Sequence, residues 1–202
     1  MSLEEITDKI VENNMLHAKW LNTLSLMENT GARKISASED KNDVTLIILK
    51  HAAEEHRHAY YLKKQIEKLD KGLCPTYNAG FLIAPASSKF YLNKLDTSVC
   101  RYLKSELNLA GSELRFAAYL LVTYAIEVRA DELYPVYQAS LDKAKSKVNV
   151  KSIIIEEEGH LEEMINQLKQ FSNDWQEHAG KAVEIETELF NDWVAQLAKE
   201  VA

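Results

Sequence analysis

Residues 54–58 read Glu-Glu-His-Arg-His and residues 156–160 read Glu-Glu-Glu-Gly-His, so one acidic motif ending in histidine occurs twice. Each copy has a glutamate three positions before its histidine, and the two pairs are Glu55 with His58 and Glu157 with His160. Residues three apart are neighbours on one face of an α-helix. If both segments are helical, each pair directs a carboxylate and an imidazole toward one point.

The segments around both motifs have the character of long helices. The 202 residues contain only six glycines and three prolines, and the stretches between them are far longer than ordinary strands. The sequence therefore predicts an all-α fold in a single domain, residues 1–202. The expected helices cover residues 3–28, 39–71, 88–107, 112–145, 150–171 and 174–202, with a loop at residues 72–88.

Local signals set the expected helix ends. Gly31 suits the left-handed position after a helix, and Ser38 and Asn149 are residue types that cap helix N-termini. Pro135 is expected to kink its helix, and Gly180 is expected to interrupt or bend the last one.

Composition limits the classes of partner. Lys and Arg number 24 against 31 Asp and Glu, a formal net charge of −7, which argues against nucleic acid and anionic membranes. The longest uncharged stretch, residues 72–88, contains glycine and proline and is no membrane span. Residues 1–9 lack a signal-peptide pattern, and Cys74 and Cys100 form no redox or zinc motif. We therefore expect a cytoplasmic protein with reduced thiols.

The inward face of four expected helices carries acids and histidines where a plain bundle would have leucine. These residues are Glu28, Glu55, His58, Glu127, Glu157 and His160. A buried carboxylate costs several kcal/mol, and no Lys or Arg lies on these stretches of the inward face. Two divalent cations would balance four carboxylates, and neutral imidazoles would complete their coordination. Two helix hairpins related by a pseudo-twofold axis would bring the six groups together.

The order Glu28, Glu55-x-x-His58, Glu127, Glu157-x-x-His160 resembles the ligand pattern of the ferritin-like di-iron or di-manganese carboxylate superfamily. The resemblance implies a ferritin-like four-helix bundle with a long crossover containing an extra helix, plus a C-terminal helix. It also implies ligand roles: Glu28 terminal on one ion, Glu127 terminal on the other or bridging, Glu55 and Glu157 bridging, and His58 and His160 terminal.

The resemblance implies an oxidoreductase that activates dioxygen with two iron ions as cofactor, manganese or a mixed pair being the alternative metals. The expected partners are dioxygen, a small apolar substrate and an external electron donor, and a homodimer is compatible with these. The long connection from His58 to Glu127 differs from a compact cage subunit, and no Cys-x-x-Cys pair of a rubredoxin-like domain is present. A non-enzymatic iron-binding or storage protein and a metal-free helical interaction module are the alternative functions.

The remaining histidines have simpler interpretations. His51 lies one turn before Glu55 on the inward face and His17 lies three turns before Glu28. We expect both to be hydrogen-bonded histidines of the core. For His51, the alternative is a further metal ligand. His56 is expected to point to solvent.

Several neighbours of the six residues leave two interpretations open. Glu54 and Glu156 either accept the second ring N–H of a ligand histidine or pair with Arg57 and solvent. Tyr61 and Tyr124 either pack in the core or serve as hydrogen-bond donors or redox-active phenols. Thr123 and Ala130, which flank Glu127, either leave space for oxygen or substrate or let helices approach closely.

Overall fold

The computed structural model describes residues 1–202 and contains helices and no strand, which confirms the all-α prediction. The elements are α1 (Leu3–Val11), α2 (Asn14–Ser38), α3 (Leu46–Ile66), a 3₁₀ turn η1 (Ala79–Phe81), α4 (Pro85–Glu106), α5 (Gly111–Lys143), α6 (Lys151–Phe171) and α7 (Trp175–Val201).

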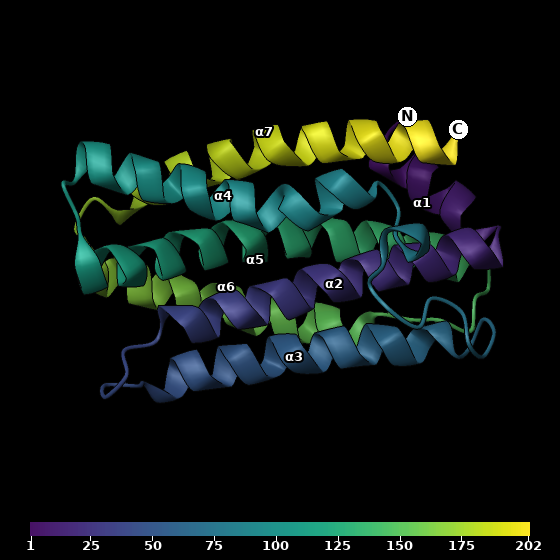
Figure 1. The fold of residues 1–202 in the computed structure, drawn as a ribbon, viewed down its shortest axis with the longest axis horizontal. Helices are drawn as coiled ribbons and strands as arrows, with labels where there is room; N and C mark the ends of the chain where they lie inside the picture. Colours follow the sequence, from purple (N-terminus) through teal and green to yellow (C-terminus); the bar gives the residue numbers. More distant parts are fainter.

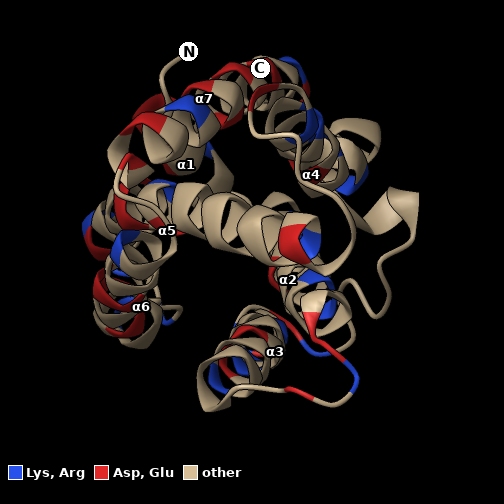
Figure 2. Ribbon diagram, turned by 90° about the vertical axis from the view of Figure 1, so that its left-hand side faces the viewer, with Lys and Arg blue, Asp and Glu red and all other residues tan.

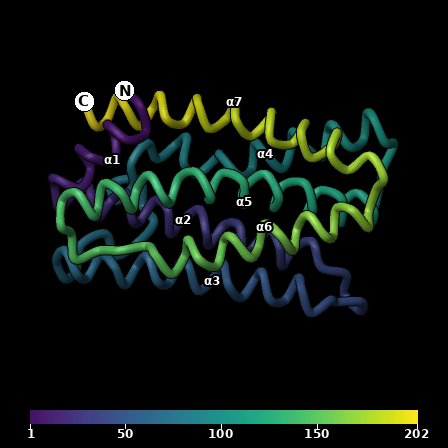
Figure 3. Tube along the Cα trace, turned by 180° about the vertical axis from the view of Figure 1, so that it is seen from behind, coloured from purple at the N-terminus to yellow at the C-terminus, as the bar shows by residue number.

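The helices run along a common long axis and form two antiparallel hairpins. α2 packs against α3, and α5 packs against α6 (Figures 1 and 3). Between the hairpins, α4 runs back along the molecule, so α5 starts at the end where α3 also starts (Figure 1). In the view along the axis, α2, α3, α5 and α6 surround one centre, while α4 and α7 cover one side (Figure 2).

The apolar core consists of two clusters that lie at different levels along this axis. The larger cluster contains Trp20, Leu62 and Tyr137, and the smaller one contains Ile48 and Leu120. Burying one large aliphatic side chain contributes about 1.5–3 kcal/mol. Packing in both clusters therefore holds the hairpins together, and the residues between the two levels are fixed from both sides.

The first hairpin has different helix ends from those predicted. A break separates α1 from α2, because the side chain of Asn13 accepts a hydrogen bond from the Leu16 amide at 3.0 Å and caps a new helix. Gly31 does not end α2, which continues to Ser38. Residue Thr45, rather than Ser38, caps the following helix.

Signals further along the chain also act differently from the expectation. The Asn149 side chain accepts a hydrogen bond from Tyr61 at 3.0 Å and does not cap α6, whose N-cap position is Val150. α5 continues past Pro135, where the sequence predicts a kink and not an end, and α7 runs through Gly180 without the predicted interruption. At Asn149 and Gly180, packing between helices outweighs the local sequence signal. None of the helices combines the length and the apolar content needed to cross a membrane.

Gly31 provides a test of the longer α2. Its φ is not in the left-handed region, and a Cβ built on it meets no atom within 4 Å. Gly31→Ala should therefore raise the free energy of unfolding by about 0.4–1 kcal/mol, because alanine restricts the unfolded chain. Urea denaturation followed by circular dichroism measures this change. A loss of stability would instead place Gly31 at a helix end.

Candidate metal centre

The six predicted residues come together at mid-length of the molecule, between the two apolar clusters. α2 supplies Glu28 and α5 supplies Glu127, while α3 and α6 each supply a Glu-x-x-His pair. All six are buried except Glu28, which is half-buried. The 3.6-residue period of the helices brings about this convergence, because every member lies on the inward face of its helix. Their role as metal ligands stays a prediction.

The six side chains form two overlapping groups. One consists of Glu28, Glu55, His58 and Glu157, and the other consists of Glu55, Glu127, Glu157 and His160. Within each group, one potential ligand atom of every residue lies within 4.8 Å of the others. Glu55 and Glu157 belong to both groups. This sharing is the arrangement that two carboxylates need in order to bridge two cations.

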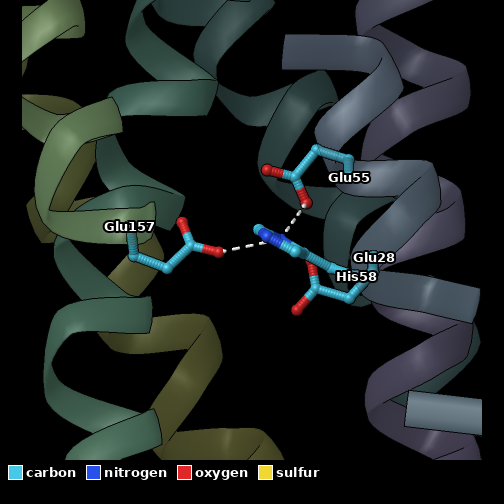
Figure 4. Close-up of side chains that lie close together, drawn as sticks. All are labelled: Glu28, Glu55, His58 and Glu157. Atoms are coloured by element: carbon cyan, nitrogen blue, oxygen red, sulfur yellow. Dashed lines mark ion pairs between the residues drawn. The ribbon is translucent and has the colours of Figure 1, made fainter. Parts of the chain in front are cut away.

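Imidazole Nδ1 atoms face the carboxylates from both hairpins. His58 Nδ1 lies 3.0 Å from Glu157 Oε1 and 3.7 Å from Glu55 Oε2 (Figure 4). His160 Nδ1 lies 3.3 Å from Glu157 Oε2 and 3.7 Å from Glu127 Oε2. The same ring atom of each histidine therefore points to the centre of the cluster.

The other ring nitrogen of each histidine is held by a carboxylate of the opposite hairpin. His58 Nε2 lies 2.7 Å from Glu156 Oε2, and His160 Nε2 lies 2.8 Å from Glu54 Oε2. Arg57 also donates to Glu156 at 2.8 Å. Glu156 therefore both accepts a histidine N–H and pairs with Arg57, as the two interpretations propose. Each glutamate contacts the histidine of the other hairpin, not the one on its own helix. Such hydrogen bonds fix the tautomer and ring orientation of histidines that bind metals.

The buried carboxylates repel one another. Burial raises the pKa of Glu28 and Glu127 well above the usual value, and repulsion from Glu55 and Glu157 adds to the shift. Burial alone would also raise the pKa of Glu157, but interactions with Glu127, His160 and His58 lower it. The cluster as a whole carries too much negative charge for its surroundings.

The histidines respond to the same negative charge. Burial lowers the pKa of His58, but the carboxylates of Glu157 and Glu55 outweigh burial and raise the pKa to about 12. Similarly, Glu157 outweighs burial and raises the pKa of His160 to about 8. Without a metal ion, protons on the imidazoles and carboxyls must supply the positive charge that the site lacks.

Cations at the periphery cannot replace such a charge. Arg57 and Lys50 are 52% and 43% exposed, and they pair with glutamates outside the cluster. Exposed ion pairs contribute about 1 kcal/mol or less, whereas a buried charge costs several kcal/mol. Two buried atoms within the cluster, His58 Nδ1 and Glu127 Oε2, have no hydrogen-bond partner. The oxygen and imidazole donors fit a pair of divalent iron or manganese ions, which would satisfy both atoms.

Tyr134 is a neighbour of the cluster that the sequence analysis did not identify. Its hydroxyl donates a hydrogen bond to Glu28 Oε1, and it is fully buried two turns beyond Glu127. Of the tyrosines considered for this role, Tyr61 instead donates to Asn149, and Tyr124 packs edge-on against Trp175. The sequence signal for Tyr134 is its position seven residues after Glu127, which is two turns further along the same helix face.

Histidines outside the six lie where the sequence predicts. His51 hydrogen-bonds Tyr119 through Nδ1 and Glu163 through Nε2, both at 2.9 Å, so neither nitrogen is free to bind a metal ion. His17 Nε2 lies 2.5 Å from the Tyr137 hydroxyl, and burial lowers its pKa to about 4. His56 is exposed.

A cavity of about 340 Å³ adjoins the cluster. Glu28, Glu55 and Glu127 form part of its wall, and Thr123 and Ala130 also line it, as one of their two predicted interpretations requires. No residue of the 72–88 loop lines the cavity.

The fold and site define an all-helical protein with a buried carboxylate–histidine cluster that could bind metal. No family model, curated protein or solved structure matches the chain.

Charge repulsion in the cluster predicts that Glu127→Gln stabilises the metal-free protein and destabilises the metal-bound protein. In metal-free protein, Glu127→Gln should raise the free energy of unfolding at pH 8 by about 1–3 kcal/mol, because the wild-type carboxyl takes up a proton on folding. The wild-type protein loses this stability as pH rises above the usual glutamate pKa. The stabilisation by Glu127→Gln should therefore shrink toward pH 5. With divalent metal present, the same variant should be less stable than wild type, because a ligand is lost.

Thermal unfolding of both proteins at pH 5 and pH 8, with a chelator and with Mn(II), measures these effects. Glu158→Gln serves as the matched control, because Glu158 is an exposed glutamate next to the cluster. Equal effects of Glu127→Gln with and without metal would contradict the assignment.

Proposed function

We propose that the protein is a ferritin-like di-iron carboxylate oxidoreductase that activates dioxygen, with manganese or a mixed pair as the alternative metals. The observation that carries the proposal is the convergence of six donors from two hairpins on one buried point, with two buried atoms unpartnered. The crossover helix α4 and the C-terminal helix α7 agree with the architecture that the ligand order implies.

The two overlapping groups suggest which residues hold each ion. Glu28 and His58 would bind one ion, Glu127 and His160 would bind the other, and Glu55 and Glu157 would bridge them. A bound pair of ferrous ions supplies electrons for the reduction of dioxygen.

The chain's own groups prepare the site for this chemistry. Glu156 and Glu54 hold the Nε2 protons of His58 and His160, which leaves each Nδ1 lone pair directed inward. Tyr134 keeps a proton on its hydroxyl beside Glu28, because burial raises its pKa well above the usual value and the Glu28 charge adds to this. The apolar clusters pack above and below the site and leave the cavity as its opening to solvent.

The adjoining cavity favours an oxidoreductase over the two alternatives. A storage protein needs a route for ions, and an interaction module needs no internal space. This cavity instead has a mainly apolar wall that ends at three of the proposed ligands. Such cavities are the usual form of small-molecule sites.

The proposal is tested by metal loading followed by exposure to oxygen. Metal-depleted protein should bind two Fe(II) per chain under anaerobic conditions, and the loaded protein should then consume dioxygen. His58→Ala should reduce the bound iron to one equivalent or less and slow oxygen consumption at least tenfold, because a ligand with a fixed orientation is lost.

His56→Ala is the matched control, since it removes an exposed imidazole from the same turn of α3, and it should load and react as wild type does. Stoichiometric loading without oxygen consumption would favour the iron-binding alternative. Absence of specific loading would favour the metal-free interaction module. Either result would contradict the proposed function.

A further inference from the structure

The cavity beside the cluster lies between α2, α4, α5 and α7, and its two ends differ in character. The inner end reaches Glu28 and Glu127, and it is lined by buried aromatic residues such as Tyr134 and Trp193. The outer end is lined by Lys34, Asp96, Cys100, Ala37 and Arg115, of which Ala37 and Arg115 are exposed. The cavity therefore opens to solvent at this end.

Most hydrogen-bond donors at the inner end are already paired. The hydroxyl of Tyr91 donates to Glu186, and Arg129 donates to both oxygens of Glu186. The Tyr134 hydroxyl donates to Glu28. The Thr123 hydroxyl, one turn before Glu127, is the remaining donor in this part of the wall, and an anionic group would meet the carboxylates of Glu28 and Glu127. The inner end thus suits an apolar portion of a ligand.

A free positive charge occurs only at the outer end of the lining. Lys34 Nζ pairs with Asp96 Oδ2 at 2.8 Å, whereas Arg115 forms no ion pair within 4 Å and only interacts at longer range with the exposed carboxylate of Asp40. Together, Lys34, Asp96 and Arg115 carry a net positive charge where the cavity meets solvent. An anionic group placed there would pair with Arg115 and remain partly hydrated.

The volume limits the size of the ligand. A cavity of roughly 150 Å³ holds benzene, and a water molecule occupies about 30 Å³ of liquid. The 340 Å³ cavity therefore accommodates about ten to twelve non-hydrogen atoms.

We propose that this cavity binds a small apolar monoanion of about ten to twelve non-hydrogen atoms, with its carboxylate or phosphate beside Arg115 and its apolar end beside Glu28 and Glu127. As the substrate class of the reaction, this inference rests on the proposed function. Binding itself does not require metal, because no residue at the outer end belongs to the cluster.

The test uses decanoate, decan-1-ol and decylamine as probes, with the full-length protein both metal-depleted and iron-loaded under anaerobic conditions. Isothermal titration calorimetry gives Kd, and a change in tryptophan fluorescence that is lost in Trp193→Phe reports binding at the cavity wall independently. Wild type should bind decanoate at least threefold more tightly than decan-1-ol, and decylamine more weakly than either.

Charge variants test the orientation. Arg115→Ala should weaken decanoate binding about three- to tenfold and change decan-1-ol binding less than twofold. Asp96→Asn should strengthen decanoate binding, because it removes a negative charge from the opening. Arg101→Ala, an exposed arginine of α4 that does not line the cavity, should change neither.

Volume variants test the place of binding. Ala118→Phe should fill the cavity and weaken decanoate binding more than tenfold. If this variant does not fold, Val122→Ala replaces it, because it enlarges the cavity and should shift the preference toward dodecanoate. Unchanged binding in the folded filling variant, or unchanged chain-length preference in the enlarged one, would overturn the proposal.

The other outcomes separate the two proposals. Equal binding of decanoate and decan-1-ol, with no effect of Arg115→Ala, would overturn the anionic specificity. Absence of binding by any probe would overturn the site while leaving the metal centre unaffected. Decanoate binding to a protein that fails to load iron would support the cavity site and contradict only the proposed function.

Discussion

The energetic cost of burying four carboxylates at one level of an apolar core governs the structure. Every long helix of the two hairpins contributes to this cost, and the apolar clusters on both sides limit the hydration of the carboxylates. Arg57 and Lys50, which pair with the outer glutamates, are half exposed, and buried Arg129 is paired with Glu186. Protons and metal cations are the remaining sources of positive charge. Metal cations balance the charge by binding the deprotonated carboxylate oxygens and imidazole nitrogens, whereas protons block these atoms.

Polar side chains add to the apolar clusters in connecting α3 with α6. These helices lack the close backbone packing that joins α2 to α3 and α5 to α6, and they stand apart in the axial view (Figure 2). His58 reaches Glu156, His160 reaches Glu54, and Lys50 pairs with Glu163 across this separation. The same interactions that orient the imidazoles therefore also fix the distance between the two hairpins, so the geometry of the centre and the assembly of the bundle depend on each other.

Much of the centre could be predicted because its information is local. Spacing within a helix fixes the direction of Glu55 relative to His58, and periodicity places both inward. The end of α2 could not be predicted from Gly31, since packing against α3 continues the helix past a residue that is free to end it. The contact of Tyr134 with Glu28, the crossed histidine partners and the cavity all depend on how separate helices face one another. A one-dimensional pattern does not specify those relations.

The most direct test of the central claim is anomalous diffraction from crystals grown anaerobically with Fe(II), recorded at the iron edge. We predict two peaks about 3.5–4 Å apart, one adjoining Glu28 and His58 and the other adjoining Glu127 and His160, with Glu55 and Glu157 between them. A single peak, peaks only at the surface, or none among these six side chains would contradict the account.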